Sequence, residues 1–509
     1  MVKRLWQALA FLLALLLTGT VAYGETTRRF NYTYGVFMVE HSVAGFELAR
    51  VIDRRYMPIP FERADDVTVA GGRVFIADSL AGRVNVLDAY DYSFITSLRL
   101  IRDTDGRIIT DEDTGEQLML DSPEGVFFNE NLNLLYIADT GAERIVVLCG
   151  DDFHFVQVIT RPDNMVGNTV FRPSRLVVDN AGRIFFMVQG SIEGLVVLEP
   201  DGSFARYFGT NPPHVSPIEF FWRSIATVEQ RQQMARNFAP PFSGLDIDPY
   251  GFVYAVTADT SAESLIFRFN ARGDNVIRDT AFIGLRGDFT LFYVNTDAQS
   301  TFGGIAVTDF GVYAVADRSF GRIFVYDFDG AVITIFSQLG DVQGGLREPS
   351  ALAWNGFDLL VADRSLGLVY VYTPNRFGRA ALLANYHVHR GNWEEATAFY
   401  REAIALNATF YAAYSGIGRN YLMQRRYREA MYYFDLALDQ LGYSRAWQGR
   451  RSELIEEWFP VLAIIVGAIS VLLIYTEVRY LKKASYQDGH TNKKVKKSRL
   501  ASLFKKEDA

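Results

Sequence analysis

The sequence predicts a mainly β protein, a six-bladed propeller, followed by an α-helical region and one transmembrane helix. Three observations lead to this prediction. A pattern of two apolar strands joined by an Asp-containing turn recurs with a period of roughly 45 to 60 residues. After the last copy, the apolar period changes from two to about 3.6 residues, which is typical of helices. Near the carboxyl end, residues 459–476 are apolar and carry no charge.

The repeated pattern gives the number of blades. Clear copies lie at residues 74–87, 135–148, 312–326 and 359–372, and looser copies lie at 184–198 and 253–269. An apolar strand precedes each copy, and we expect that strand to be the innermost strand of its blade. The sequence therefore predicts six blades.

The motif itself resembles that of a known repeat family. Tyr136-Ile-Ala-Asp-Thr140 is followed by Arg144-Ile145, and this is similar to the signature of NHL-repeat propellers. The resemblance covers about residues 30–378, with an insertion at 210–243. It implies the propeller fold and no particular activity, because one fold hosts many functions.

One early strand has no blade of its own. Residues 46–52 are apolar enough to form a strand but precede the first copy of the pattern. A ring of blades avoids an exposed edge only if its two ends are joined. We therefore expect this strand to be the outer strand of the last blade, paired near residues 369–373.

Composition limits the classes of partner and of chemistry. The 509 residues are 49% hydrophobic and 14% aromatic, which suffices for a large core, and the net charge of −8 argues against nucleic acid as a partner. The only cysteine, Cys149, is predicted to be a buried and inert thiol. The propeller histidines, His41, His154 and His214, lack the spacing of zinc ligands.

Two hydrophobic segments predict export and anchoring. Residues 1–24 resemble a signal peptide, with an uncleaved anchor as the alternative. Residues 459–476 are long enough for a transmembrane helix. The following tail, 477–509, contains ten Lys or Arg and four Asp or Glu, so the positive-inside rule predicts a cytoplasmic tail and an extracytoplasmic propeller at the cell membrane.

The helical region, residues 380–457, contains two copies of another pattern. Ala396 and Ala430 are 34 residues apart, each in a Glu-Ala context followed by an aromatic residue. This spacing resembles tetratricopeptide repeats, although Ala408 and Gly442 stand where that family has its closing proline. The aromatic residues are interpreted as packing residues, with a peptide-binding groove as the alternative.

The Asp of the propeller motif has a structural interpretation. Asp78, Asp139, Asp317 and Asp363 occupy the same position in four blades. One carboxylate per blade at a turn is expected to accept hydrogen bonds from nearby backbone, and we expect no metal site there.

Polar residues at the starts of the innermost strands form a better candidate site. They should converge on one mouth of the central channel, and they are Asp65, Asp66, Glu124, Ser174, Arg175, Ser243 and Ser350. The segment around Glu124 resembles the calcium-dependent gluconolactonase propellers, whose matching glutamate binds metal. The other ligands of that family have no counterpart here, so an ion pair between Glu124 and Arg175 is the competing interpretation. Glu124 is thus the one candidate metal ligand, calcium the one candidate cofactor, and no catalytic residue is assigned.

The insertion at 210–243 carries an aromatic cluster, Phe220, Phe221 and Trp222. Long loops are often functional, so the cluster is a candidate partner-binding lid, and packing against the blades is the alternative.

Taken together, these features predict a membrane-anchored binding or scaffold protein of the cell envelope that recognises protein or carbohydrate. Similar bacterial NHL-propeller membrane proteins accompany sugar-type transporters, which implies transporter components as partners. The alternative function is a carbohydrate-directed lactonase or lyase.

Overall fold

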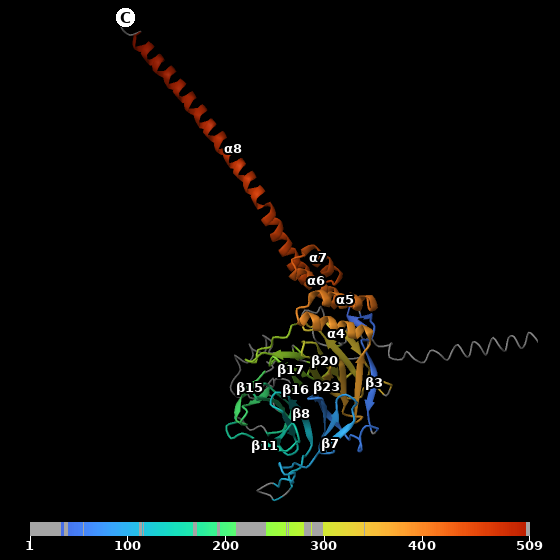
Figure 1. Ribbon diagram of the computed structural model, residues 1–509. Coiled ribbons are helices and arrows are strands. Elements are labelled where there is room, and N and C mark those ends of the chain that lie inside the picture. Colours follow the sequence, from blue (N-terminus) through green and yellow to red (C-terminus); the bar gives the residue numbers. More distant parts are fainter. Residues whose placement is uncertain are drawn as a thin grey trace, which may run out of the picture. The chain divides into compact units, whose positions relative to one another are not determined.

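The computed structural model describes residues 32–504, except for 35–38, 54, 111–114, 116, 166–169, 191–193, 210–240, 261, 263, 279–286, 288–298 and 341. Most of the amino-terminal part forms six antiparallel sheets that follow one another along the chain (Figure 1). A short hairpin, β1 (Tyr32–Tyr34) and β2 (Val39–His41), precedes them.

The first three sheets each have four described strands. The first contains β4 (Ala64–Ala70), β5 (Arg73–Asp78), β6 (Arg83–Asp88) and β7 (Phe94–Leu98). The second contains β8 (Pro123–Asn129), β9 (Leu134–Asp139), β10 (Arg144–Cys149) and β11 (Phe155–Ile159). The third contains β12 (Pro173–Val178), β13 (Ile184–Val188), β14 (Leu195–Leu198) and β15 (Phe204–Phe208).

The other three sheets complete the set. The described part of the fourth contains β16 (Phe242–Ile247), β17 (Val253–Thr257) and β18 (Ile266–Phe269). The fifth contains β19 (Phe302–Val307), β20 (Tyr313–Asp317), β21 (Arg322–Tyr326) and β22 (Val332–Phe336). The sixth contains β23 (Pro349–Asn355), β24 (Asp358–Asp363), β25 (Leu368–Pro374) and β3 (Phe46–Ile52).

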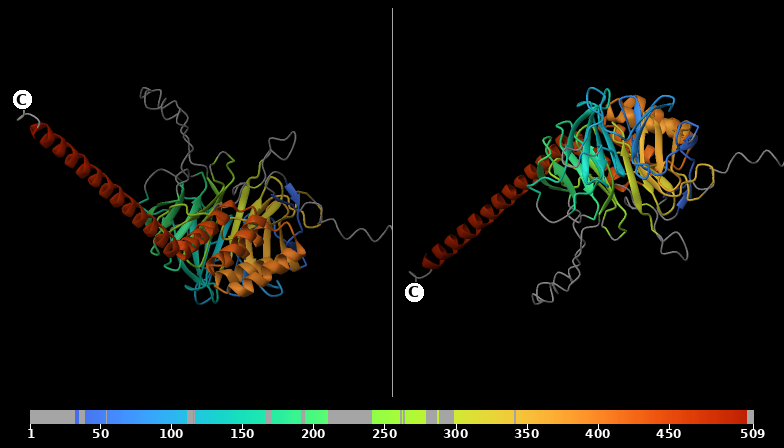
Figure 2. Two further views of the ribbon diagram at one scale, coloured as in Figure 1. Left: turned by 90° about the horizontal axis from the view of Figure 1, so that it is seen from above. Right: turned by 90° about the horizontal axis from the view of Figure 1, so that it is seen from below.

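The first strands of the sheets form a closed ring. β4 contacts β8, and the contacts continue through β12, β16, β19 and β23 back to β4. Each sheet is therefore a blade, and its first strand is the innermost one. In Figure 2, the blue start of the chain lies beside the yellow and orange strands at the end of the propeller. The predicted six-bladed propeller is confirmed.

The ring closes through the early strand, as predicted. β3 pairs antiparallel with β25, and this register places Ile52 opposite Val369 and Glu47 opposite Thr373. The last blade therefore combines three strands from the end of the propeller with one from its beginning. This pairing removes the free edge that β25 would otherwise present.

The core lies between neighbouring blades. Alternate residues of a strand point to opposite faces of its sheet, so each blade contributes one apolar face to each neighbour. Between the first two blades, the rings of Phe75 and Phe128 stack with their centroids 5.3 Å apart. Between the sixth and first blades, Ile52 and Val371 pack with Val74. Both strands of the closing pair therefore contribute to the core.

Helix α4 (Arg376–His389) is fixed to the propeller at both ends. At its start, Asn375 caps the helix by accepting a hydrogen bond from the Gly378 amide, at 3.0 Å. A Cβ atom at Gly378 would collide with the carbonyl oxygen of Gly45, just before β3. At its end, His389 Nε2 and the Tyr250 hydroxyl are 2.8 Å apart.

The position of α4 identifies one face of the propeller. Tyr250 lies in the turn between β16 and β17, and Phe310, in the turn between β19 and β20, packs edge-on against Tyr386 of α4. These turns stand where innermost strands end. Helix α4 therefore covers the face of the propeller opposite to the one where innermost strands begin.

Four more helices follow. They are α5 (Trp393–Leu406), α6 (Tyr411–Met423), α7 (Tyr427–Leu436) and α8 (Gln440–Phe504). The chain forms two compact units, residues 1–417 and 418–509. In the second unit, Ala430 and Phe434 of α7 pack with Ala446 of α8. The predicted helical region after the propeller is thus confirmed.

Helix α8 includes the predicted transmembrane segment. Within residues 440–483 of this helix, an 18-residue stretch is apolar enough to cross a membrane and is not buried within the structure. The side chains of this stretch have no interior of their own to pack into. Helix α8 is therefore a candidate membrane span.

The closing strand gives a test of stability. We expect Ile52→Ala to lower the free energy of unfolding by about 2–5 kcal/mol, because it removes a fully buried side chain from the seam of the ring. The matched control is Ile59→Ala, whose side chain is 57% exposed and which should change stability by less than about 0.5 kcal/mol. Denaturant unfolding of the detergent-solubilised chain measures both. Equal losses in the two variants would contradict the role of β3.

Candidate functional site

A β-bulge occurs near the start of every innermost strand. The pairing of each first strand with its second strand shifts register at this point in all six blades. The residues at the shifts are Asp65, Glu124, Ser174 with Arg175, Ser243, Gly303 and Ser350. Because a bulge re-aims side chains locally, these residues form a ring around one mouth of the channel.

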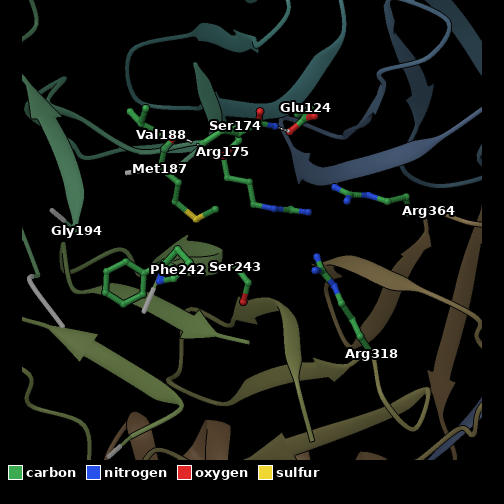
Figure 3. A pocket seen from close by; sticks show the side chains of 13 residues that line it. Glu124, Ser174, Arg175, Met187, Val188, Gly194, Phe242, Ser243, Arg318 and Arg364 are labelled. Carbon is green, nitrogen blue, oxygen red and sulfur yellow. Dashed lines mark hydrogen bonds between the residues drawn. The ribbon is translucent and has the colours of Figure 1, made fainter. Parts of the chain in front are cut away.

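A pocket occupies this mouth, with a cavity volume of about 220 Å³. Glu124, Ser174, Arg175 and Ser243 line it, together with Gln189, Arg318 and Arg364, which follow second strands. In Figure 3, the three guanidinium groups converge on one side of the pocket, and Met187, Val188 and Phe242 form the other side. The site therefore has a charged half and an apolar half, and it lies on the face that α4 does not cover.

Arg175 crosses the channel and forms the floor of the pocket. From the third blade, its Nη1 contacts Asp66 Oδ1 of the first blade at 2.6 Å. Its Nη2 donates to the carbonyl oxygens of Asp65 at 2.8 Å and of Ser350, in the sixth blade, at 2.9 Å. Burial raises the pKa of Asp66, and the positive charge of Arg175 opposes this shift. The buried ion pair ties three blades together.

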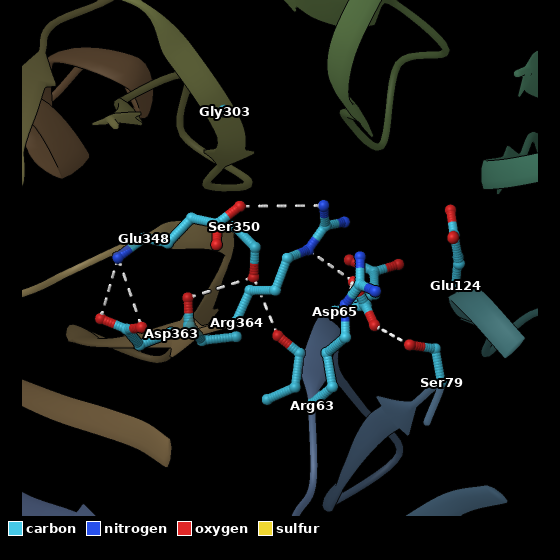
Figure 4. Close-up of polar contacts among 12 residues, drawn as sticks. Arg63, Asp65, Ser79, Glu124, Gly303, Glu348, Ser350, Asp363 and Arg364 are labelled. Atoms are coloured by element: carbon cyan, nitrogen blue, oxygen red, sulfur yellow. Dashed lines mark hydrogen bonds and ion pairs between the residues drawn. The ribbon is translucent and has the colours of Figure 1, made fainter. Parts of the chain in front are cut away.

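Asp65 is fully buried beside this floor (Figure 4). Its carboxylate forms ion pairs with Arg364 at 2.6 Å and with Arg63 at 3.2 Å, and it accepts a hydrogen bond from the Ser79 hydroxyl. Arg364 is also 3.9 Å from Glu348. Asp65 and Asp66 are therefore at the predicted mouth, but arginines hold both carboxylates.

Glu124 lies in the pocket, but its contact differs from the expected one. Its carboxylate accepts a hydrogen bond from Gln189 Nε2 at 2.6 Å, whereas Arg175 pairs with Asp66. The alternative interpretation, an ion pair between Glu124 and Arg175, is wrong, because Asp66 of the first blade holds that guanidinium instead. Ser350 does not line the pocket; its hydroxyl donates to the Ala64 carbonyl at 2.9 Å and joins the sixth blade to the first.

Arg318 is a pocket residue that sequence reasoning missed. Its guanidinium donates a long hydrogen bond to the Gly303 carbonyl at 3.5 Å, and no described carboxylate lies within ion-pair distance of it. Burial, together with the charges of Arg175 and Arg364, lowers the pKa of Arg318 to about 10. A Cβ at Gly303 would collide with this side chain, so the glycine leaves space for it.

A signal for Arg318 was present in the repeats. It directly follows the repeated Asp317, as Arg364 follows Asp363. In the first two blades, Ser79 and Thr140 occupy the same position. Comparing the residue after the Asp across blades would have identified these arginines.

The repeated aspartates accept hydrogen bonds from nearby backbone amides, as expected. Asp363 accepts hydrogen bonds from the backbone amides of Arg347 at 2.7 Å and Leu366 at 3.1 Å. Asp139 accepts from the Asp121 amide at 2.6 Å and pairs with Arg144 at 2.8 Å. Each carboxylate therefore joins the segment leading into its blade to the end of the second strand.

Two further sequence predictions are affected. Cys149 is half-buried rather than buried, because it ends β10, where the sheet meets solvent. The Cys149 Sγ atom, a carboxylate oxygen of Asp152 and a ring nitrogen of His154 could together hold a metal ion, since they lie within 4.8 Å of one another. The His154 Nδ1 atom is 2.5 Å from Asp152 Oδ1. The spacing of the histidines in the sequence did not reveal this group.

The candidate lid, Phe220, Phe221 and Trp222, lies outside the described residues, as does His214.

Comparisons with known proteins address the fold alone. No protein-family model matches the chain. No curated protein matches it either. Among solved structures, a streptogramin B lyase is similar over 65% of this chain and 98% of its own, with 12% identity and a TM-score of 0.39. The Swd1 (Cps50) β-propeller of Myceliophteria thermophila is similar over 65% of this chain and 100% of its own, with 9% identity and a TM-score of 0.38. Virginiamycin B lyase from Staphylococcus aureus with quinupristin is similar over 65% of this chain and 100% of its own, with 13% identity and a TM-score of 0.38.

Another acid, Asp246 in β16, titrates near neutral pH. Its Oδ2 accepts a hydrogen bond from the Val307 amide of the next blade at 2.7 Å. Burial, together with the charges of Asp66 and Asp248, raises the pKa of Asp246 to about 7. The folded protein therefore holds a proton here over a pH range in which the unfolded chain has lost it.

This shift predicts how stability depends on pH. Because the pKa of Asp246 is higher in the folded protein than in the unfolded chain, its contribution to the free energy of unfolding is most favourable below pH 4. This contribution is lost as the pH rises toward 7. Relative to Asp246→Asn, the wild type should lose about 1 kcal/mol or less per pH unit between pH 5 and 7. Denaturant unfolding at several pH values measures this difference. The exposed control, Asp309→Asn, should show no such trend, and a flat difference for Asp246→Asn would refute the assignment.

Proposed function

We propose that this chain is a membrane-anchored, extracytoplasmic binding and scaffold protein of the cell envelope. Its NHL-type propeller presents a ligand pocket, its tetratricopeptide-like helices form a stalk, and its basic tail lies in the cytoplasm. Protein or carbohydrate ligands, with transporter components as partners, fit this arrangement.

The observation that carries the proposal is the pocket at the channel mouth. Concave sites with an apolar wall and a few fixed polar groups are typical of ligand recognition. Here Phe242 and Met187 supply the apolar wall, and the ion pair of Arg175 with Asp66 makes the floor rigid. The site is open on the face away from α4.

The packing of the helices after the propeller supports the proposal of a tetratricopeptide-like stalk. In α5, Ala396 and Tyr400 are buried, and Gly416 of α6 lies so close to Tyr400 that a Cβ would collide with the ring. In the second unit, Ala430 and Phe434 repeat the same small-then-aromatic pair. Small residues that admit a neighbouring helix are the feature expected of paired-helix repeats.

The alternative function, a metal-dependent lactonase, receives less support. A divalent cation at Glu124 would share the pocket with three guanidinium groups. Its repulsion from these charges would be strong in a half-buried site. Asp65 and Asp66, the nearest other acids of the predicted set, are already paired with arginines. The charge of the pocket favours an anionic group over a cation.

Topology gives a direct test of the proposed location. Protease added to intact spheroplasts should digest the propeller and spare an epitope in the tail, because the ten basic residues of 477–509 are retained inside. Replacing these ten residues by Gln should reduce the fraction of molecules whose tail is in the cytoplasm. Protection of the propeller in intact spheroplasts would contradict the proposal. Crosslinking in the same membranes, followed by capture of the chain, tests for a protein partner.

A further inference from the structure

We propose that the pocket binds a small hydroxylated carboxylate, the size of one acidic sugar ring, with its carboxylate on Arg318. This inference rests on the proposed binding function and names the class of ligand. It starts from the charge balance of the pocket.

Ion pairs satisfy most of the charged groups around the channel mouth. Arg175 is paired with Asp66 at 2.6 Å. Arg364 is shared between Asp65 at 2.6 Å and Glu348 at 3.9 Å. Among the described residues, two lining charges are left without an ion-pair partner, the guanidinium of Arg318 and the carboxylate of Glu124.

Arg318 is suited to an anion. Its guanidinium is directed into the cavity beside those of Arg175 and Arg364 (Figure 3). Burial is the main cause of the lowered pKa of Arg318, and the positive charges of Arg175 and Arg364 act in the same direction. With a pKa of about 10, the group still carries its charge at pH 7. The planar guanidinium fork matches a carboxylate, to which it can donate two parallel hydrogen bonds.

The rest of the lining indicates what the carboxylate is attached to. Glu124 accepts and Gln189 both donates and accepts, so together they can bind ligand hydroxyl groups. Phe242 and Met187 offer an apolar wall to the C–H face of a ring. The cavity of about 220 Å³ is smaller than pockets for drug-sized ligands, which begin near about 300 Å³. A single hydroxylated ring with one carboxylate satisfies these requirements.

Calorimetric titration of the detergent-solubilised full chain tests the proposal with three probes: D-glucuronate, D-glucose and D-glucose 6-phosphate. Glucuronate should bind at least about 10-fold more tightly than glucose, because a charge-assisted contact is lost in glucose. Arg318→Gln should weaken glucuronate binding about 10- to 100-fold. The matched control is Arg272→Gln, in a side chain that is 84% exposed, and it should bind glucuronate as the wild type does.

Folding is checked on the same samples. Arg318→Gln removes a charge that has no described ion-pair partner, so its thermal midpoint should not fall. If that variant nevertheless unfolds, Arg318→Lys serves instead; it keeps the charge but loses the fork, and glucuronate binding should still weaken.

Several results would overturn the inference. Equal affinity for glucose and glucuronate would show that the ligand carboxylate does not bind Arg318. Unchanged affinity for glucuronate in the Arg318 variants would show the same. Tighter binding of glucose 6-phosphate would assign the site to phosphate instead. Failure of all three probes would refute an acidic-sugar site. The spheroplast protease assay and the crosslinking capture do not depend on Arg318, so they report separately on the proposed envelope function.

Discussion

The hydrogen bonding of β3 to β25 is the constraint on which the rest of the structure depends. It joins two segments that are more than 300 residues apart in the sequence, so it closes a long loop and makes the six blades into one ring. Ring closure in turn holds the innermost strands side by side. The channel mouth exists only because these six strands begin at the same level.

Within the closed ring, one local irregularity generates the site. Each innermost strand has a bulge near its start, and the blades differ in which side chain stands there: carboxylates, serines, an arginine and a glycine. The glycine, Gly303, makes space for Arg318 from the neighbouring strand of its own blade. The two shortest ion pairs at the mouth, Arg175 with Asp66 and Arg364 with Asp65, join different blades. The asymmetry of the pocket therefore arises from side chains placed on a nearly symmetric backbone.

The sequence was sufficient for the parts of the structure that depend on periodicity. The repeat spacing predicted six blades, and the unassigned strand at residues 46–52 predicted the closure. Strand starts also predicted that Glu124 and Arg175 reach the same mouth. The partner of Arg175 could not be predicted, because several carboxylates converge there and their distances are set by the packing of blades far apart in the sequence. Exposure of Cys149 was mispredicted for a similar reason, since it depends on where β10 ends.

Closure within a single blade also determines how the propeller bears mechanical load. The partner of Phe46, the first residue of β3, is Pro374, the last residue of β25, so the chain enters and leaves the ring at the same end of one strand pair. A force applied between the segment before β3 and helix α4 acts on that end first and separates the strands one hydrogen bond at a time. Asn375 bonds to the Ala44 carbonyl there, and Phe46 stacks on Phe336 with ring centroids 4.9 Å apart. These two contacts therefore resist separation at the end of the strand pair on which the force acts first.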